Sequence, residues 1–294
     1  MAQASTLDQL LRNNKCDDRS SVTNTRIPDR NLGIYGGKYN LDGPIKDQFH
    51  KLYHKKVFIE GEHEYLTEAQ LNSGMITLDF DFKYGPEIEE RKHNDDHIND
   101  LIEMYIEQIK NILEFKPDKK FFIWVFQKDN VNQLEDKTKD GIHILIELEM
   151  SQNSQLLLRK KILGECNNVL EDLELTNRYD DVLDIGVTGG SVNWQVYGSR
   201  KPGHEAYKIK NTYEVFFDKD LEENIVEIDN HSSIELIKMT SVRRKDLLKF
   251  DYKEDIKKEL EDMCKKKKKK KRTKKIKLKL KTNCISLEEK FTNI

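Results

Sequence analysis

The chain has 294 residues, of which 36% are hydrophobic and 35% are charged, so it can bury a core while remaining heavily charged. Its apolar runs fall short of the roughly 20 residues that a membrane span requires, and its N-terminus lacks the pattern of a secretion signal. Four scattered cysteines (Cys16, Cys166, Cys264 and Cys284) form neither a CxxC pair nor a zinc-ligand spacing. We therefore expect an intracellular protein with reduced thiols, no zinc and no membrane contact.

The net charge of −2 conceals a strong asymmetry along the chain. Residues 265–281 carry 13 basic side chains and no acidic one, whereas the first 264 residues carry 37 basic and 51 acidic side chains, a net charge of −14. A polycationic tail on an acidic body is typical of proteins that bind an anionic polymer. A solvated tract that binds nothing has the same composition, so both interpretations stay open.

Composition divides the chain into four parts. Residues 1–30 are polar with few apolar anchors, and we expect a loosely ordered extension there. Residues 31–245 contain most of the apolar and aromatic residues and are expected to form the folded domain. A helix is predicted at 246–264, and the polybasic tail at 265–294 is expected to be disordered.

Strand-like and helix-like patterns alternate within the predicted domain. In chain order they are a strand at Val57–Gly61, a strand at Met75–Phe82 (MITLDFDF), a helix at Asn94–Phe115, strands at Phe121–Phe126 and Gly141–Met150, a helix at Ser154–Leu175, strand fragments with glycine-rich turns at 180–203, and a strand at Thr212–Asp218. Several strands follow one another directly. This order favours an α+β fold with helices covering a sheet over a doubly wound parallel sheet.

Two carboxylates interrupt the apolar strand MITLDFDF. Residues two apart in a strand point to the same face, so Asp79 and Asp81 project side by side while Leu78, Phe80 and Phe82 face the core. Neighbouring carboxylates repel each other and are unfavourable to desolvate. A divalent cation such as Mg²⁺ or Mn²⁺, which prefers oxygen ligands, would relieve both penalties. An edge strand with a solvated outer face is the alternative.

Two further acidic or titratable motifs follow the carboxylate pair. His143 lies in the strand KDGIHILIE on the face opposite its isoleucines, where a histidine can be structural or functional. Asp184 closes the short apolar run VLDIGV just before a glycine-rich loop. Asp180 and Asp181 are neighbouring competitors for the same role, so this assignment stays open at the sequence level.

The segment NWQVYGSRKPG combines a turn with two cations. Its turn offers free N–H groups near Ser199, and Arg200 and Lys201 supply positive charge, a combination that suits a phosphate contact. A surface turn would have the same composition.

The order and spacing of these motifs resemble those of a known protein superfamily. A strand DxD, a strand histidine about sixty residues later and an apolar-Asp about forty residues further on resemble the archaeo-eukaryotic primase (AEP) superfamily. LDFDFKYG, KDGIHI and NWQVYGSRKPG are most similar to the primase domain of the primase–helicases of nucleocytoplasmic large DNA viruses. The resemblance covers roughly residues 24–217. It implies an RRM-like catalytic sheet with flanking helices plus an N-terminal α/β part.

The resemblance also implies an activity, partners and site residues. The activity is that of a DNA primase or primase-polymerase, a nucleotidyltransferase that makes short primers on single-stranded DNA from nucleoside triphosphates. The reaction would use two-metal catalysis. Its setting would be viral DNA replication in the host cytoplasm or the nucleus. By position, the Mg²⁺ or Mn²⁺ ligands and catalytic residues are Asp79, Asp81 and Asp184, the nucleotide contacts are His143, Ser199, Arg200 and Lys201, and the tail contacts to DNA are Lys265, Lys268, Lys271 and Arg272.

Departures from the family pattern leave alternatives open. Gly141 stands where many members of the superfamily have Ser. The chain also has no GxxxxGK[ST] motif, so the helicase is expected to be separate or missing. We therefore expect a stand-alone gene product, a split gene product or a fragment. The other functional hypotheses are a catalytically inactive nucleic-acid-binding replication subunit and a metal-dependent DxD glycosyltransferase. Trp194, Tyr197 and Tyr207 are candidates for a template groove or for the core.

Overall fold

The computed structural model describes residues 4–229 and 231–266. The chain divides into two compact units, Met1–Asp251 and Tyr252–Ile294. The α-helices of the larger unit are α1 (Leu7–Asn13), α2 (Lys46–His54), α3 (Asp95–Ile112), α4 (Gln152–Leu163), α5 (Cys166–Leu170), α6 (Tyr179–Val182), α7 (Ile185–Thr188) and α8 (Ser233–Met239). Within the described residues, no helix combines the length and the hydropathy of a membrane span.

Two antiparallel sheets organise the larger unit. The strands of the smaller sheet are, in spatial order, β2 (Gly37–Tyr39), β1 (Asn24–Arg26), β3 (Leu66–Glu68) and β9 (Trp194–Gln195). The strands of the main sheet are β11 (Glu223–Glu227), β10 (Lys208–Phe217), β6 (Lys120–Gln127), β8 (Thr138–Ser151) and β4 (Ser73–Tyr84), with β7 (Asn132–Gln133) beside β8. The short strands β5 (Leu113–Glu114) and β12 (Asp251–Tyr252) lie outside these two sheets.

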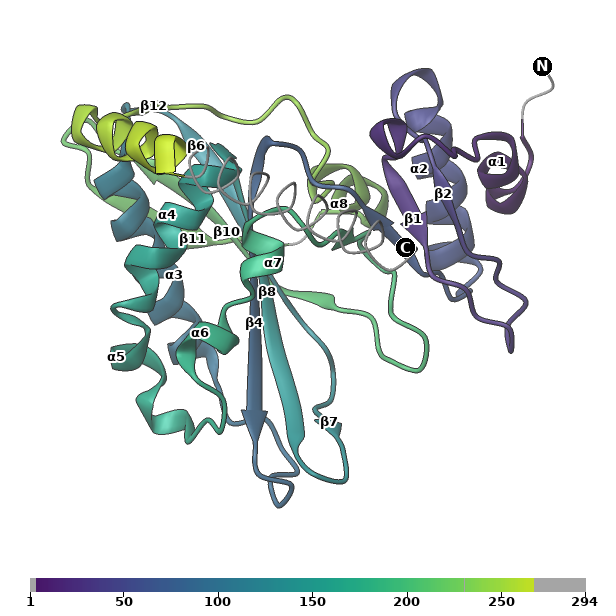
Figure 1. Ribbon diagram of the computed structural model, residues 1–294, viewed down its shortest axis with the longest axis horizontal. Helices are drawn as coiled ribbons and strands as arrows, with labels where there is room; N and C mark the ends of the chain where they lie inside the picture. The colour runs from purple at the N-terminus through teal and green to yellow at the C-terminus, as the bar shows by residue number, and fades with distance from the viewer. Residues whose placement is uncertain (1–3, 230, 267–294) are drawn as a thin grey trace, which may run out of the picture. The chain divides into compact units, whose positions relative to one another are not determined.

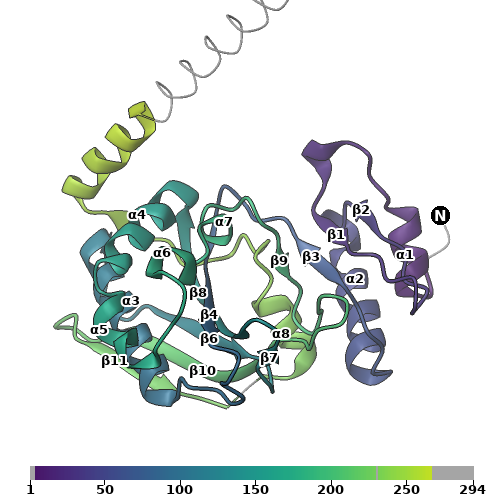
Figure 2. The ribbon, with the colours of Figure 1, turned by 60° about the horizontal axis from the view of Figure 1, so that its bottom comes forward.

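The two faces of the main sheet are covered differently. Helices α3 and α4 lie on one side of it, as Figure 1 and Figure 2 both show. The alternation of β4 directs Phe80 to that side, where its ring packs edge-on against Tyr105 of α3. Apolar residues of α3 at three- and four-residue spacing are buried there, and Asn94 caps the helix start. The fold is therefore the predicted α+β arrangement of a sheet with flanking helices.

The N-terminal segment is folded, which corrects the expectation of a loosely ordered extension. Strand β1 pairs with β2 and β3, and α1 buries Leu7, Leu10 and Leu11 in an apolar cluster with Phe49 and Tyr53 of α2. The apolar stripe of α1 lies within seven residues, which is too short for a helical period to stand out in a polar sequence.

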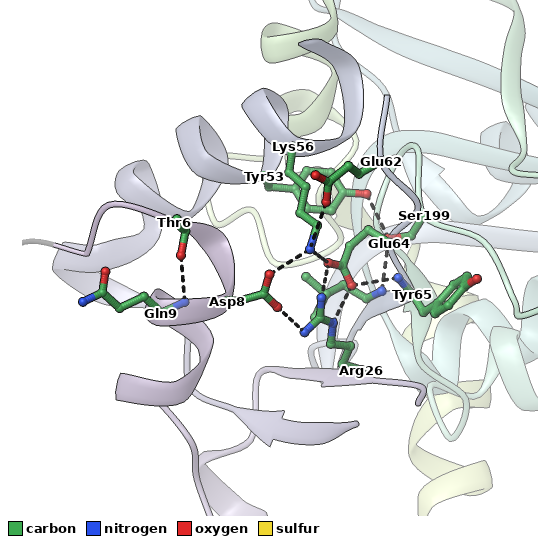
Figure 3. Close-up of polar contacts among 11 residues, drawn as sticks. Thr6, Asp8, Gln9, Arg26, Tyr53, Lys56, Glu62, Glu64, Tyr65 and Ser199 are labelled. Atoms are coloured by element: carbon green, nitrogen blue, oxygen red, sulfur yellow. Dashed lines mark hydrogen bonds and ion pairs between the residues drawn. The ribbon is translucent and has the colours of Figure 1, made fainter. Parts of the chain in front are cut away.

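Buried ion pairs attach α1 to the smaller sheet (Figure 3). The Arg26 guanidinium donates to both carboxylate oxygens of Glu64 and to Asp8 Oδ1, each at 2.7 Å. Lys56 Nζ donates to Asp8 Oδ2 at 2.9 Å and lies 3.6 Å from Glu64. The Glu64 side chain is fully buried, so an unpaired charge there would be strongly destabilising. Removing either cation would therefore weaken the attachment of α1.

Three predicted elements differ from the structure. Residues 57–61 are not a strand, because Lys55–Ile59 forms a π-helical turn that continues α2 and packs the Phe58 ring against Tyr197. Residues 180–203 contain the short helices α6 and α7 before strand β9 begins. The predicted helix at 154–175 ends at Leu163 and resumes as α5. At residues 57–61 local strand propensity gave way to packing.

The C-terminal helix begins later than predicted. Residues 254–266 are helical, whereas residues 246–253 are not and include β12. The predicted tail beyond residue 266 lies outside the described residues.

His50 of α2 gives a pH-dependent test of this fold. Its ring is buried without hydrogen-bond partners, and burial, with the charges of Lys46 and Lys238, lowers its pKa to about 4. The unfolded chain binds the proton near pH 6.5, so stability falls as the pH drops from about 6.5 to 4, by about 2 kcal/mol at pH 5. We expect His50→Phe to remove this loss, measured by urea unfolding at pH 7 and pH 5. Equal losses in variant and wild type would contradict the assignment.

Candidate functional site

Three carboxylates converge at the edge of the main sheet. Asp79 and Asp81 of β4 and Asp184, which precedes α7, place carboxylate oxygens within 4.8 Å of one another. Asp184 reaches this position because its backbone N–H donates to the Asp79 carbonyl at 2.9 Å, and because Leu183 bridges to Phe80. The structure therefore brings together the three acids that the sequence motifs singled out.

The side chain of Asp184 is oriented by its role as a helix cap. Its Oδ1 accepts hydrogen bonds from the N–H groups of Gly186 (2.5 Å) and Val187 (3.4 Å) at the start of α7. The Asp180 and Asp181 side chains are 70% and 50% exposed and lie near Arg159 and Arg178, respectively. The structure therefore places Asp184, and neither competitor, beside the DxD pair.

His143 lies opposite Asp79 in the register of β4 and β8. Its Nε2 is 3.3 Å from Asp79 Oδ1, on the same face of the sheet as the three acids. The imidazole stacks on the Tyr207 ring, with centroids 3.6 Å apart, and also contacts Trp194 at 4.7 Å. These two rings fix the orientation of the imidazole next to the carboxylates.

The two strand carboxylates have opposite pKa shifts. Burial raises the pKa of Asp79, but the positive charges of His143, Lys201 and Lys128 outweigh burial, so its pKa lies below the ordinary value. Burial and the Asp79 charge raise the pKa of Asp81. One carboxylate is thus held ionised by neighbouring cations, while the second is destabilised by the first, as expected for acids that share a site.

A polar cleft of about 260 Å³ opens over the three acids. Besides the acids and His143, its lining includes Lys128 at the end of β6, Lys139 of β8 and Lys201. Lys128 Nζ lies 4.9 Å from the centroid of the Tyr207 ring. Neither Lys128 nor Lys139 stands out in the sequence. They sit in the polar ends of strands, and only strand register brings such residues to one site.

The turn at residues 198–201 (GSRK) was predicted to bind nucleotide through three residues, and two of them lie outside the cleft, which corrects that prediction. Ser199 is 2% exposed; its Oγ accepts the Leu66 N–H at 3.1 Å and bonds to the Tyr53 hydroxyl at 2.9 Å (Figure 3). Arg200 lies 3.3 Å from His63 and does not line the cleft. Ser199 therefore holds the turn against β3 and α2 through these hydrogen bonds, and Lys201, two residues later, lines the cleft.

The predicted groove aromatics have different positions. Trp194 is buried in an apolar cluster, and Tyr197 packs between Phe58 and Phe126. Tyr207 lines the cleft. Trp194 and Tyr197 are therefore core residues, and Tyr207 belongs to the site.

The predicted DNA-binding residues of the tail fall largely outside the described part of the chain. Lys268, Lys271 and Arg272 lie beyond residue 266. Lys265 is described, and its Nζ lies 3.2 Å from Asp262 and 3.8 Å from Glu261. Its ammonium group thus lies beside two carboxylates of the same helix.

Gly141 is required by close strand packing. It pairs with Asp81, and a Cβ at this position would lie 2.5 Å from the Phe80 carbonyl oxygen. A side chain here would push β8 away from β4. The departure from the Ser of other superfamily members therefore has a steric reason in this chain.

The GSRK turn yields a paired prediction. We expect Ser199→Ala to lower the free energy of unfolding by about 1–3 kcal/mol, because it leaves the buried Leu66 N–H without an acceptor. Lys201→Ala should change stability by less than about 0.5 kcal/mol, since Lys201 is exposed, but should weaken nucleotide binding. Urea unfolding and nucleotide titration distinguish the two. Unchanged stability with lost nucleotide binding in Ser199→Ala would restore a direct contact for Ser199.

Comparison with known proteins gives two matches. Residues 30–213 match the family described as C962R protein N-terminal AEP domain. A curated protein of Acanthamoeba polyphaga mimivirus, described as "Putative helicase L207/L206", is 27% identical over 206 residues. That match covers 69% of this chain and 21% of the relative, so the matched part spans about a fifth of the relative's length. The three acids, His143 and Lys201 all lie within the family match.

Proposed function

Because this chain belongs to the family of C962R protein N-terminal AEP domains, a branch of the archaeo-eukaryotic primases, we propose that it is a primase or primase-polymerase that makes short primers on single-stranded DNA. Residues 31–245 would form the catalytic domain. The observation that carries the proposal is the convergence of Asp79, Asp81 and Asp184 next to a cleft lined by lysines.

The donor set at the three acids fits a divalent cation. All the ligand atoms are carboxylate oxygens, two of the acids lie on a rigid strand, and the buried Asp79 Oδ1 makes no regular hydrogen bond, although His143 Nε2 lies 3.3 Å from it. Such oxygen ligands suit Mg²⁺ or Mn²⁺, and we propose Asp79, Asp81 and Asp184 as the ligands of two such ions. When bound, the ions would activate the attacking 3′-hydroxyl and neutralise charge on the leaving group.

The cations of the cleft suit the triphosphate of an incoming nucleotide. The pKa of Lys128 is lowered by burial and by the charge of Lys201. A phosphate chain between the two lysines would relieve their repulsion, and His143 would contribute a further donor. In the proposed reaction the 3′-oxygen forms a bond to the α-phosphorus, the bond to the β-phosphate oxygen breaks, pyrophosphate leaves and the hydroxyl proton passes to solvent.

The proposed partners follow from the tail and from the relative. We propose single-stranded DNA as the template and nucleoside triphosphates as substrates. A helicase on another chain, or on a longer form of this one, would supply unwound template, in line with the name of the mimivirus relative. The proposed setting is viral DNA replication inside the host cell.

Substitution of the strand acids tests the catalytic proposal. We expect Asp79→Asn and Asp81→Asn each to abolish detectable primer synthesis and to weaken Mn²⁺ binding, because each removes a ligand charge. Thermal unfolding should show that both variants remain folded. The readout is labelled product formed on single-stranded DNA, with Mn²⁺ binding followed by electron paramagnetic resonance.

Asp181→Asn provides the matched control, because Asp181 lies near the triad in sequence but pairs with Arg178 outside it. It should retain near-wild-type synthesis. Normal synthesis by either strand variant would overturn the assignment. A wild-type chain that binds single-stranded DNA but adds no nucleotide would instead support the non-catalytic hypothesis.

Removal of residues 265–294 tests the tail. Truncation removes 14 basic and two acidic side chains and leaves a chain with a net charge of −14. We expect its affinity for single-stranded DNA to fall roughly tenfold at about 50 mM salt and its salt dependence to become shallower, because fewer counterions are released. Nucleotide addition at saturating template should persist. Fluorescence anisotropy across a salt series measures both effects, and an unchanged affinity and slope would show that the tail does not bind DNA.

A further inference from the structure

Two aliphatic side chains stand exposed beside the acidic triad. Ile185, which directly follows Asp184, is 59% exposed, and Val192, which lines the cleft, is 45% exposed. Contact between water and large aliphatic side chains is unfavourable. The rest of the cleft lining is dominated by charged and polar side chains. Val192 lies close to Gly186, the residue that follows Ile185, so the two aliphatic side chains belong to one exposed apolar patch at the border of a polar site.

The loop that carries this pair is held in place by hydrogen bonds. Gln70 Nε2 donates to the carbonyls of Val187 and Val192, each at 2.9 Å. The Val192 N–H donates to the Gly186 carbonyl at 3.1 Å. A Cβ on Gly186 would lie 2.8 Å from Val192 Cγ2, so the glycine permits Val192 to lie against the start of α7. These contacts connect the loop to Gln70 and to the start of α7.

The patch lies on the opposite side of β4 from Lys128 and Lys139. One edge of β4 pairs with β8, which carries Lys139, and β6, which ends just before Lys128, lies beyond β8. Leu183 bridges to the other edge of β4, and the chain continues from there into Asp184 and Ile185. The triad thus separates a cationic side of the site from an apolar side.

This separation has a direct consequence for nucleotidyl transfer. The attacking and leaving oxygens lie roughly in line through the phosphorus, on opposite sides of it. With the pyrophosphate on the lysine side, the attacking 3′-hydroxyl comes from the side of Ile185 and Val192. We infer that these two residues bind the sugar and base of the nucleotide at the 3′ end of the primer. The inference rests on the proposed function and assigns its primer-binding subsite.

A double variant tests this subsite. The full chain carrying Ile185→Ser and Val192→Ser is compared with wild type in the extension of a short primer annealed to template, with Mn²⁺. We expect the KM for the primer–template to rise about tenfold or more, because two apolar contacts are lost, and the KM for the incoming nucleotide to change less than about twofold. The conservative exchange Ile185→Val with Val192→Ile should restore the primer KM.

Binding without turnover provides an independent readout. A primer with 2-aminopurine at its 3′ end is titrated with each protein and Mn²⁺ in the absence of nucleotide, and weaker binding by the double Ser variant supports the inference. Val226→Ser is the matched control, because Val226 is 47% exposed on β11, away from the cleft lining. A double Ser variant that stays folded and has an unchanged primer KM and unchanged 2-aminopurine binding overturns the inference. Failure of the wild type to extend any primer instead overturns the proposed function.

Discussion

Repulsion between the carboxylates of Asp79 and Asp81 is the constraint on which the site depends. The two side chains share one face of β4, and Asp184 adds a third negative charge. The fold offsets this repulsion with His143 opposite Asp79 and with lysines across the cleft, and the pKa of Asp79 falls while that of Asp81 rises. Clustered carboxylates are stable only where cations balance their negative charge, so the three acids suit a divalent ion. The lysines across the cleft in turn suit a triphosphate.

The pairing of β4 with β8 converts this local constraint into a site. Antiparallel register sets His143 against Asp79 and Gly141 against Asp81, and the missing side chain at Gly141 lets the strands approach. The opposite edge of β4 receives the Asp184 segment through backbone contacts. The strand therefore has a cationic neighbour on one edge and an apolar loop on the other. The two sides of the acidic triad therefore differ in chemistry, and this difference would orient a substrate that the three acids alone would not orient.

Sequence periodicity predicted the elements whose patterns are long. Helix α3 and strands β4, β6, β8 and β10 were recognised because each buries a continuous stripe or face. Short elements were missed for the opposite reason. Helix α1 buries three leucines within seven residues, and the apolar run at 57–61 forms a helical turn because Phe58 packs on Tyr197. In both cases contacts with distant residues decide the local structure.

The sequence by itself determined the DxD pair, the strand histidine and their order, because these are local patterns, and the resemblance to AEP primases follows from that order. It left the third acid open among Asp180, Asp181 and Asp184, and the structure selected Asp184. Only the tertiary structure decided which neighbours complete the site. It buried Ser199 as an anchor, left Lys201 in the cleft, and added Lys128 and Lys139 through strand register. The physical reason is that polar residues at strand ends carry no periodic signal, because their partners are set by pairing between segments distant in the chain.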